Sequence, residues 1–233
     1  LDFKDNIKAN NVQNYVRDLD LYTAISSVNY DYDNVNYNRE YFISYPDNVM
    51  VTKISASEKG KLSFDVRIEP DNSHGEGRNT NNGYSRTFTR TAKDGLITIS
   101  GHLDDNQMKF NSQTKVINTG GTITDLADGK VNVKDADYVL ILTAMGTDYK
   151  NDYPKYRTGE TDEELAIKIN KRIVDATKKG YEGLLKSHLS DYQEIFSRVD
   201  LNLGQTPSSI PTDQLLRNYN NGTAPESEQR DLE

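Results

Sequence analysis

The stretch that decides the fold is YVRDLDLYTAISSVNYDYDNVNYNREYFISYPDNVMV, at residues 15–51. It contains an LDL segment, two runs rich in Tyr and Val on either side of Asp33-Asn34, and a further apolar run after Pro46-Asp47. Apolar and polar residues that alternate between turn residues are typical of β-strands with one buried face. The stretch therefore predicts consecutive antiparallel strands joined by short turns.

The same alternation continues as far as residue 145. In KLSFDVRIE the apolar residues Leu62, Phe64, Val66 and Ile68 share one face of the expected strand, so that face should be buried. The run DYVLILTAM at 137–145 is apolar on both faces, which indicates a central strand. We therefore predict a mainly β fold, an antiparallel super-β-sandwich.

Helical signals appear only after this region. Thr161 and Glu164 form a capping box that opens an amphipathic helix, and Gly180 is expected to break it. The second helix carries an apolar stripe predicted to be buried, made up of Leu184, Leu185, His188, Leu189, Tyr192, Ile195 and Phe196. The pair forms a short α-helical linker that must dock on the sandwich or on a further domain.

Three segments carry a resemblance to a known family. The RDLDLYTA and YNREYFISYPDNVMV patterns in 15–51, the segment at 95–121 and KGYEGLLKSHLSDYQEIFSRVDLNLG at 179–204 resemble the N-terminal β-domain and linker of glycoside hydrolase family 95, the α-L-fucosidases. The resemblance implies a β-sandwich domain at 1–157, incomplete at its start, a helical linker at 158–200, and at 201–233 the approach to an (α/α)6 catalytic barrel. The chain is therefore expected to be a fragment without that barrel.

The resemblance also implies a function for the intact parent. It would be an inverting exo-glycosidase that removes terminal α-L-fucose, with the α-1,2 linkage expected, and this fragment would be catalytically inactive. The partners would be the missing barrel of the same chain and the glycan substrate of the parent. Because such enzymes are typically exported, an extracellular or cell-surface bacterial protein is expected.

Composition excludes several other classes of function. The net charge is −8, and no segment concentrates the Lys and Arg that nucleic-acid binding needs. No apolar run approaches the ~18 residues of a membrane span. The chain has no cysteine, which removes disulfides and every Cys-based metal site or nucleophile.

No set of residues converges on a catalytic or metal site in the sequence. His74, His102 and His188 lack zinc-ligand spacing, and His188 is interpreted as a buried, hydrogen-bonded helix residue. The acidic groups Asp104-Asp105 and 162–164 are interpreted as a turn and a helix N-terminus. Clustered oxygen ligands at 31–34 or at 104–106 suggest calcium, but a turn explains both clusters. We therefore predict no catalytic residue, no metal and no cofactor.

Sugar contact is the remaining possibility, because β-sandwiches often stack glycans on aromatic side chains. The chain has 15 Tyr and no Trp, and the tyrosines between 30 and 45 are interpreted as cross-strand pairs and core-edge residues. The sugar-contact candidates are the tyrosines expected in loops: Tyr84, Tyr149, Tyr153 and Tyr156. The alternative function is a carbohydrate-binding or protein-interaction β-sandwich module; a third is an enzyme whose active site lies within these residues.

Overall fold

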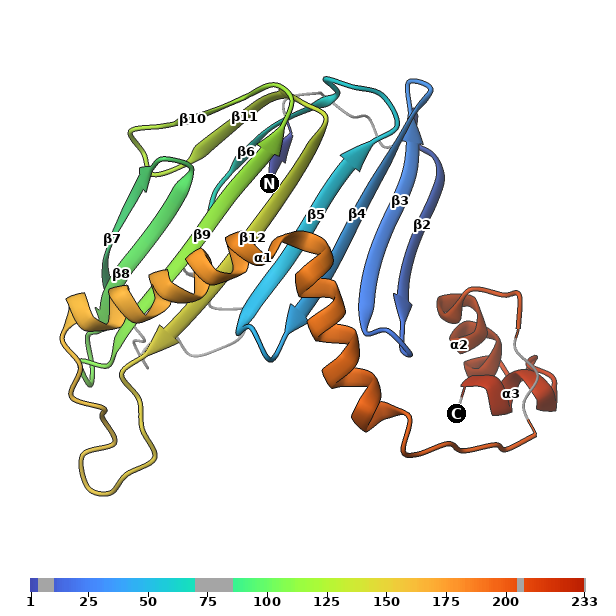
Figure 1. Ribbon diagram of the computed structural model, residues 1–233. Helices are drawn as coiled ribbons and strands as arrows, with labels where there is room; N and C mark the ends of the chain where they lie inside the picture. Colours follow the sequence, from blue (N-terminus) through green and yellow to red (C-terminus); the bar gives the residue numbers. More distant parts are fainter. Residues whose placement is uncertain (4–10, 70–85, 205–207, 233) are drawn as a thin grey trace. The chain divides into compact units, whose positions relative to one another are not determined.

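The computed structural model describes residues 1–3, 11–69, 86–204 and 208–232. The chain divides into two compact units, Leu1–Gln193 and Glu194–Glu233. In the described residues the first unit contains two antiparallel sheets and most of the long helix α1 (Asp162–Phe196) (Figure 1). The predicted fold class, a mainly β antiparallel sandwich followed by a helical linker, is confirmed.

The larger sheet has eight strands and is antiparallel throughout. In spatial order the strands are β2 (Gln13–Asp20), β3 (Ile25–Tyr32), β4 (Val35–Ser44), β5 (Val49–Ala56), β12 (Tyr138–Thr147), β9 (Lys109–Thr119), β8 (Leu96–Leu103) and β7 (Arg86–Lys93). Two meanders, β2 to β5 and β7 to β9, thus lie on either side of β12 (Figure 1).

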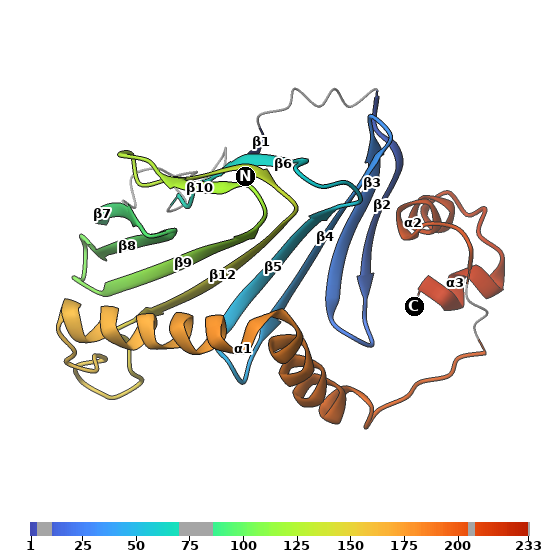
Figure 2. The same cartoon turned by 45° about the horizontal axis from the view of Figure 1, so that its top comes forward.

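The smaller sheet covers part of one face of the larger sheet (Figure 2). In spatial order it contains β1 (Asp2–Phe3), β6 (Leu62–Val66), β11 (Val131–Ala136) and β10 (Thr122–Asp125). Leu62, Phe64 and Val66 are buried in the core between the two sheets. This confirms the predicted buried face of the KLSFDVRIE strand.

Helix α1 lies across the opposite face of the larger sheet (Figures 1 and 2). A second core forms there, with Leu165 and Ile169 of the helix packed in one cluster with strand residues that include Phe42. Strand β12 contributes to both cores: Val139 and Ile141 belong to the first, Leu140 and Leu142 to the second. The prediction of a central strand that is apolar on both faces is confirmed.

Both ends of the first half of α1 follow the sequence signals. The backbone N–H of Thr161 donates to Glu164 Oε2 (2.8 Å), and the N–H of Glu164 donates to Thr161 Oγ1 (3.1 Å), which is the predicted capping box. Gly180 interrupts the helix with φ 67° and ψ 175°, as expected.

The predicted apolar stripe of the second half is only partly correct. Leu184 and His188 are buried, but Ile195 is 64% exposed and Phe196 is 41% exposed. Before these exposed residues, Tyr192 and Gln193 donate hydrogen bonds to carbonyl oxygens of the β2–β3 turn.

The strand tyrosines between 30 and 45 include structural pairs, as interpreted from the sequence. Tyr30 and Tyr37 face each other across β3 and β4, are buried, and stack with ring centroids 5.2 Å apart. The β3–β4 turn is made by Asp33 and Asn34, both in the left-handed region with φ 52° and 61°. Such backbone angles match the twist of a two-residue hairpin.

The second unit contains α2 (Thr212–Asn220) and α3 (Glu226–Leu232). Leu215 is its buried apolar residue, while Leu216 and Tyr219 are about half exposed. None of the helices in the described part of the chain has the length and apolar character needed to cross a membrane.

Candidate functional site

Three of the four predicted sugar-contact tyrosines lie on the loop between β12 and α1. Tyr153 is 82% exposed, Tyr149 52% and Tyr156 39%. The rings of Tyr153 and Tyr156 contact edge to face, with centroids 6.2 Å apart. Tyr84 lies outside the described residues. The structure thus brings three exposed tyrosines together on one loop.

The loop is held at its base by hydrogen bonds. Tyr149 pairs with Arg157 as an antiparallel bridge, and the N–H of Tyr156 donates to the Asp152 carbonyl (2.9 Å). The buried Asp148 carboxylate accepts the Lys109 backbone N–H (3.0 Å) and lies 3.6 Å from Arg157 Nε. Aromatic side chains on a braced loop lose little conformational freedom on binding, which favours contact with a ligand.

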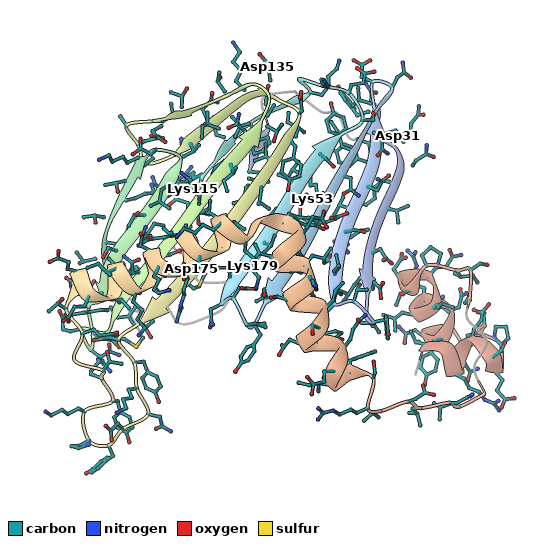
Figure 3. All side chains as sticks on the ribbon, in the orientation of Figure 1. Asp31, Lys53, Lys115, Asp135, Asp175 and Lys179 are labelled. Atoms are coloured by element: carbon teal, nitrogen blue, oxygen red, sulfur yellow. The ribbon has the colours of Figure 1, made fainter. Side chains whose placement is uncertain are left out.

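The loop leads into α1, whose kink is fixed from the sheet side by charged and aromatic groups. Tyr181, directly after Gly180, donates its hydroxyl to the Glu40 carboxylate, which also accepts from Lys53 Nζ (2.9 Å). Lys53 Nζ lies 4.4 Å from the centroid of the Tyr181 ring. On the other side of the kink, Lys179 Nζ donates to Asp47 Oδ1 (2.7 Å); Figure 3 shows Lys179 on the helix and Lys53 on the sheet next to it.

Protonation at the kink follows from this arrangement. Burial tends to raise the pKa of Glu40, but the hydrogen bonds from Tyr181 and Lys53 outweigh it and lower that pKa overall. Burial, aided by the negative charges of Glu182 and Glu40, raises the pKa of Tyr138 to about 12. Burial and the hydrogen bond to Glu40 likewise raise the pKa of Tyr181. At neutral pH Glu40 is therefore ionised and both phenols are neutral, which preserves the hydrogen bond from Tyr181 and the ion pair with Lys53.

The second half of α1 is attached to the β2–β3 turn. The hydroxyl of Tyr192 donates to the Leu21 carbonyl (2.6 Å), and His188 Nε2 lies 2.8 Å from the Thr23 carbonyl oxygen. His188 also stacks on Phe42, with centroids 4.9 Å apart. The interpretation of His188 as a buried, hydrogen-bonded residue is confirmed.

The sequence predicted that the helices dock on another surface, but it did not predict which side chains of α1 and the sheet contact each other. Glu40 and Lys53 are directly opposite each other on β4 and β5, so a strand alignment would have suggested their pairing. The partner Tyr181 is 141 residues away from Glu40, and no local pattern links the two.

The other histidines and acidic residues considered as catalytic or metal-binding groups lie at turns and at the ends of strands or helices. His102 lies at the end of β8, 3.8 Å from Asp104 in the following turn, and residues 162–164 form the first turn of α1. His74 falls outside the described residues. Among the described side chains, no three His, Cys, Asp or Glu residues are grouped to hold a metal ion.

Parts of the chain match two protein-family models, and most of it is similar in sequence to known proteins. Residues 3–152 match the family model described as "Glycosyl hydrolase family 65, N-terminal domain", and residues 180–233 match "Glycosyl hydrolase family 95 catalytic domain". The chain is 30% identical over 224 residues to "Alpha-L-fucosidase 2" of Arabidopsis thaliana, covering 92% of this chain and 26% of that protein. It is 29% identical over 222 residues to "Probable alpha-fucosidase A" of Aspergillus niger, covering 89% and 26%.

A solved structure shares the fold at low sequence identity. It is titled "Putative kojibiose phosphorylase from human microbiome", with a TM-score of 0.60 and 10% identity, over 79% of this chain and 25% of that chain. The chain spans about a quarter of the length of the two curated relatives named above.

Proposed function

Because the chain belongs to the family of glycosyl hydrolase family 65 N-terminal domains, we propose that it is the non-catalytic N-terminal part of an α-fucosidase. The whole protein would be an inverting family 95 enzyme that removes terminal, α-1,2-linked fucose outside the cell. The names of the two curated relatives and the family 95 match at 180–233 support this proposal.

The observation that carries the proposal is the position of α1. The match to the catalytic domain begins at residue 180, where α1 kinks, while the helix before the kink is packed on the sandwich. One helix thus leads from the β-domain into the segment that resembles the catalytic domain. In this role the β-domain supplies a rigid base, and α1 sets the direction in which the chain enters the barrel.

The loop at residues 148–157, called here the braced loop, has a role of its own in the proposed enzyme. Tyr149, Tyr153 and Tyr156 present exposed rings and hydroxyls on a loop immediately before α1. Phenol rings offer an apolar face and a polar edge, which suits the mixed surface of a sugar ring. We assign them to glycan contact beside the barrel, not to catalysis.

The test compares two proteins. The 233-residue chain and the same chain extended through the family 95 catalytic domain are each assayed for hydrolysis of an aryl α-L-fucoside. We expect turnover from the extended protein alone. Turnover by the 233-residue chain above the buffer rate, or none by a folded extended protein with any fucoside linkage, would overturn the proposal. Replacing Tyr153 by Ala in the extended protein should raise KM for a natural glycan more than for the small aryl substrate.

A further inference from the structure

The end of the sandwich that carries the β3–β4 turn contains two adjoining cavities. One is ≈770 Å³ and is lined by the β3–β4 turn, Gln13 and Ser57. The other is ≈460 Å³ and extends towards Lys61 and Asp135. They share Tyr32 and Asp33 as lining residues, so together they form one groove, called here the end groove. Figure 3 shows Asp31 and Asp135 at this end of the two sheets.

One wall of the end groove is held in place by its own hydrogen bonds. The Asp31 carboxylate accepts from Asn14 Nδ2 (2.6 Å) and from Asn36 Nδ2 (2.7 Å). The backbone N–H of Asn36 donates to Ser57 Oγ (3.0 Å), and the N–H of Ser57 donates to the Asn36 carbonyl (2.8 Å). These bonds join the β3–β4 hairpin to the turn after β5, so the wall is pre-organised.

Other polar groups of the end groove remain available for a ligand. Within the described part of the chain, the side chains of Gln13, Asp33 and Asn34 make no hydrogen bond or ion pair with the protein. Amides both donate and accept, and a carboxylate accepts, which matches the hydroxyl groups of a sugar. Asn34 has φ 61°, a backbone angle at which glycine is the easier residue.

The charge and the shape of the end groove indicate which class of ligand it could bind. The end groove contains three carboxylates, from Asp31, Asp33 and Asp135, against one ammonium group, from Lys61. An anionic ligand would be repelled by this balance. The half-buried ring of Tyr32 lies between the two cavities and provides an apolar surface for the face of a sugar ring. Taken singly, each of the two cavities has a volume in the range of ordinary small-molecule sites.

We propose that the end groove is a binding site for a neutral oligosaccharide, with Tyr32 as its stacking surface and Gln13, Asp33 and Asn34 as its hydroxyl-binding groups. This site goes beyond the proposed function. It is separate in sequence from the braced loop and involves no residue of 180–233. Binding at the end groove does not depend on fucoside hydrolysis. It would hold a glycan on the β-domain while another part of the protein acts on it.

The experiment is a titration of the isotope-labelled 233-residue chain, followed by amide NMR, with a neutral fucosylated lactose and with a sialylated lactose. Asn34→Gly is the informative variant, because glycine suits its backbone angle and only the amide side chain is lost. Asn48→Gly is the matched control: Asn48 also has positive φ (53°) but lies in the turn at the opposite end of β4.

We expect the neutral sugar to shift the amides of Asn34, Asn36 and Ser57 and to bind more tightly than the sialylated one. Loss of one hydrogen bond in Asn34→Gly should weaken binding about three- to tenfold, with Asn48→Gly unchanged. The proposal is overturned if neither sugar binds, if the sialylated sugar binds equally well, if both variants retain full affinity, or if the shifts are confined to residues 149–157. Failure of the fucoside assay would leave these results unaffected, so the two proposals are tested separately.

Discussion

Replacing Gly180 by Ala tests how firmly the kink of α1 is imposed by the sheet. The φ of 67° and ψ of 175° at this residue lie in a region that is essentially restricted to glycine, and an alanine there costs about 1–3 kcal/mol. Apart from the adjacent residues and the nearby backbone of the helix itself, no heavy atom lies within 4 Å of the position that the new Cβ would take, so the cost is conformational and not a clash with the sheet.

The variant has one alternative, which is to straighten the helix. A regular helix through residue 180 gains about 1 kcal/mol from the better helix propensity of Ala. However, straightening removes the fully buried Leu184 from its core, at about 1.5–3 kcal/mol, and breaks the hydrogen bonds of His188 and Tyr192, at about 0.5–1.5 kcal/mol each. Straightening would also relieve the backbone strain, so its gain is about 2–4 kcal/mol against losses of about 2.5–6 kcal/mol, and we expect the kink to persist under strain.

The expected result for Gly180→Ala is therefore a free energy of unfolding lower by about 1–3 kcal/mol in denaturant titrations, with unchanged hydrogen-exchange protection at 181–193. Lys178→Ala, an exposed change in the preceding turn, should stay within ~0.5 kcal/mol. If Gly180→Ala is as stable as the parent chain and 181–193 lose protection, the helix has straightened. The contacts of its second half with the sheet would then be worth less than the backbone strain at residue 180.

Three further changes probe the same surfaces. Leu184→Ala should lower the free energy of unfolding by about 2–5 kcal/mol, whereas exposed Lys186→Ala should cost under ~0.5; equal losses in denaturant titrations would contradict the docking of α1. Asp148→Ala should speed tryptic cleavage at Lys150 and Lys155 several-fold, because it removes the acceptor at the base of the loop; an unchanged rate argues against bracing. The folded-state pKa of Glu40 is lowered, so its stabilising effect is present above its ordinary value of 4.5 and is lost as the pH falls below it. Glu40→Gln should therefore flatten the stability profile on the acid side of pH 5, and a profile that keeps its acid slope would place that slope in other carboxylates.

Turns, helix starts and helix breaks could be predicted where one or two neighbouring residues determine the backbone conformation. The Asp33-Asn34 turn, the capping box of Thr161 and Glu164, and the break at Gly180 were predicted because each depends on neighbours in the chain. Periodicity also identified β12 as central, since its apolar residues occupy both faces.

The candidate sites were harder to predict because they depend on distant parts of the chain. The apolar stripe of α1 extends in sequence to Phe196, but helical spacing alone does not tell which of its residues the fold buries. Asp31, Asp33 and Asn34 were noticed only as a turn or as oxygen ligands for calcium. Their relation to Ser57 and Asp135 requires the β3–β4 hairpin to meet the turn after β5 and the bulged end of β11.

The place of β12 in the larger sheet has a consequence for how the protein is made. Its neighbours β5 and β9 belong to two separate meanders, and its partner residues on β5, such as Ser55 opposite Tyr138, precede it by more than 80 positions. During synthesis both meanders leave the ribosome with the edge that will face β12, β5 in one and β9 in the other, unpaired, and neither of these edges is closed until β12 has emerged. Long-range pairing of this kind is slow, and exposed strand edges recruit other chains. The nascent protein is therefore most vulnerable to aggregation in the interval before residue 147 is free to insert.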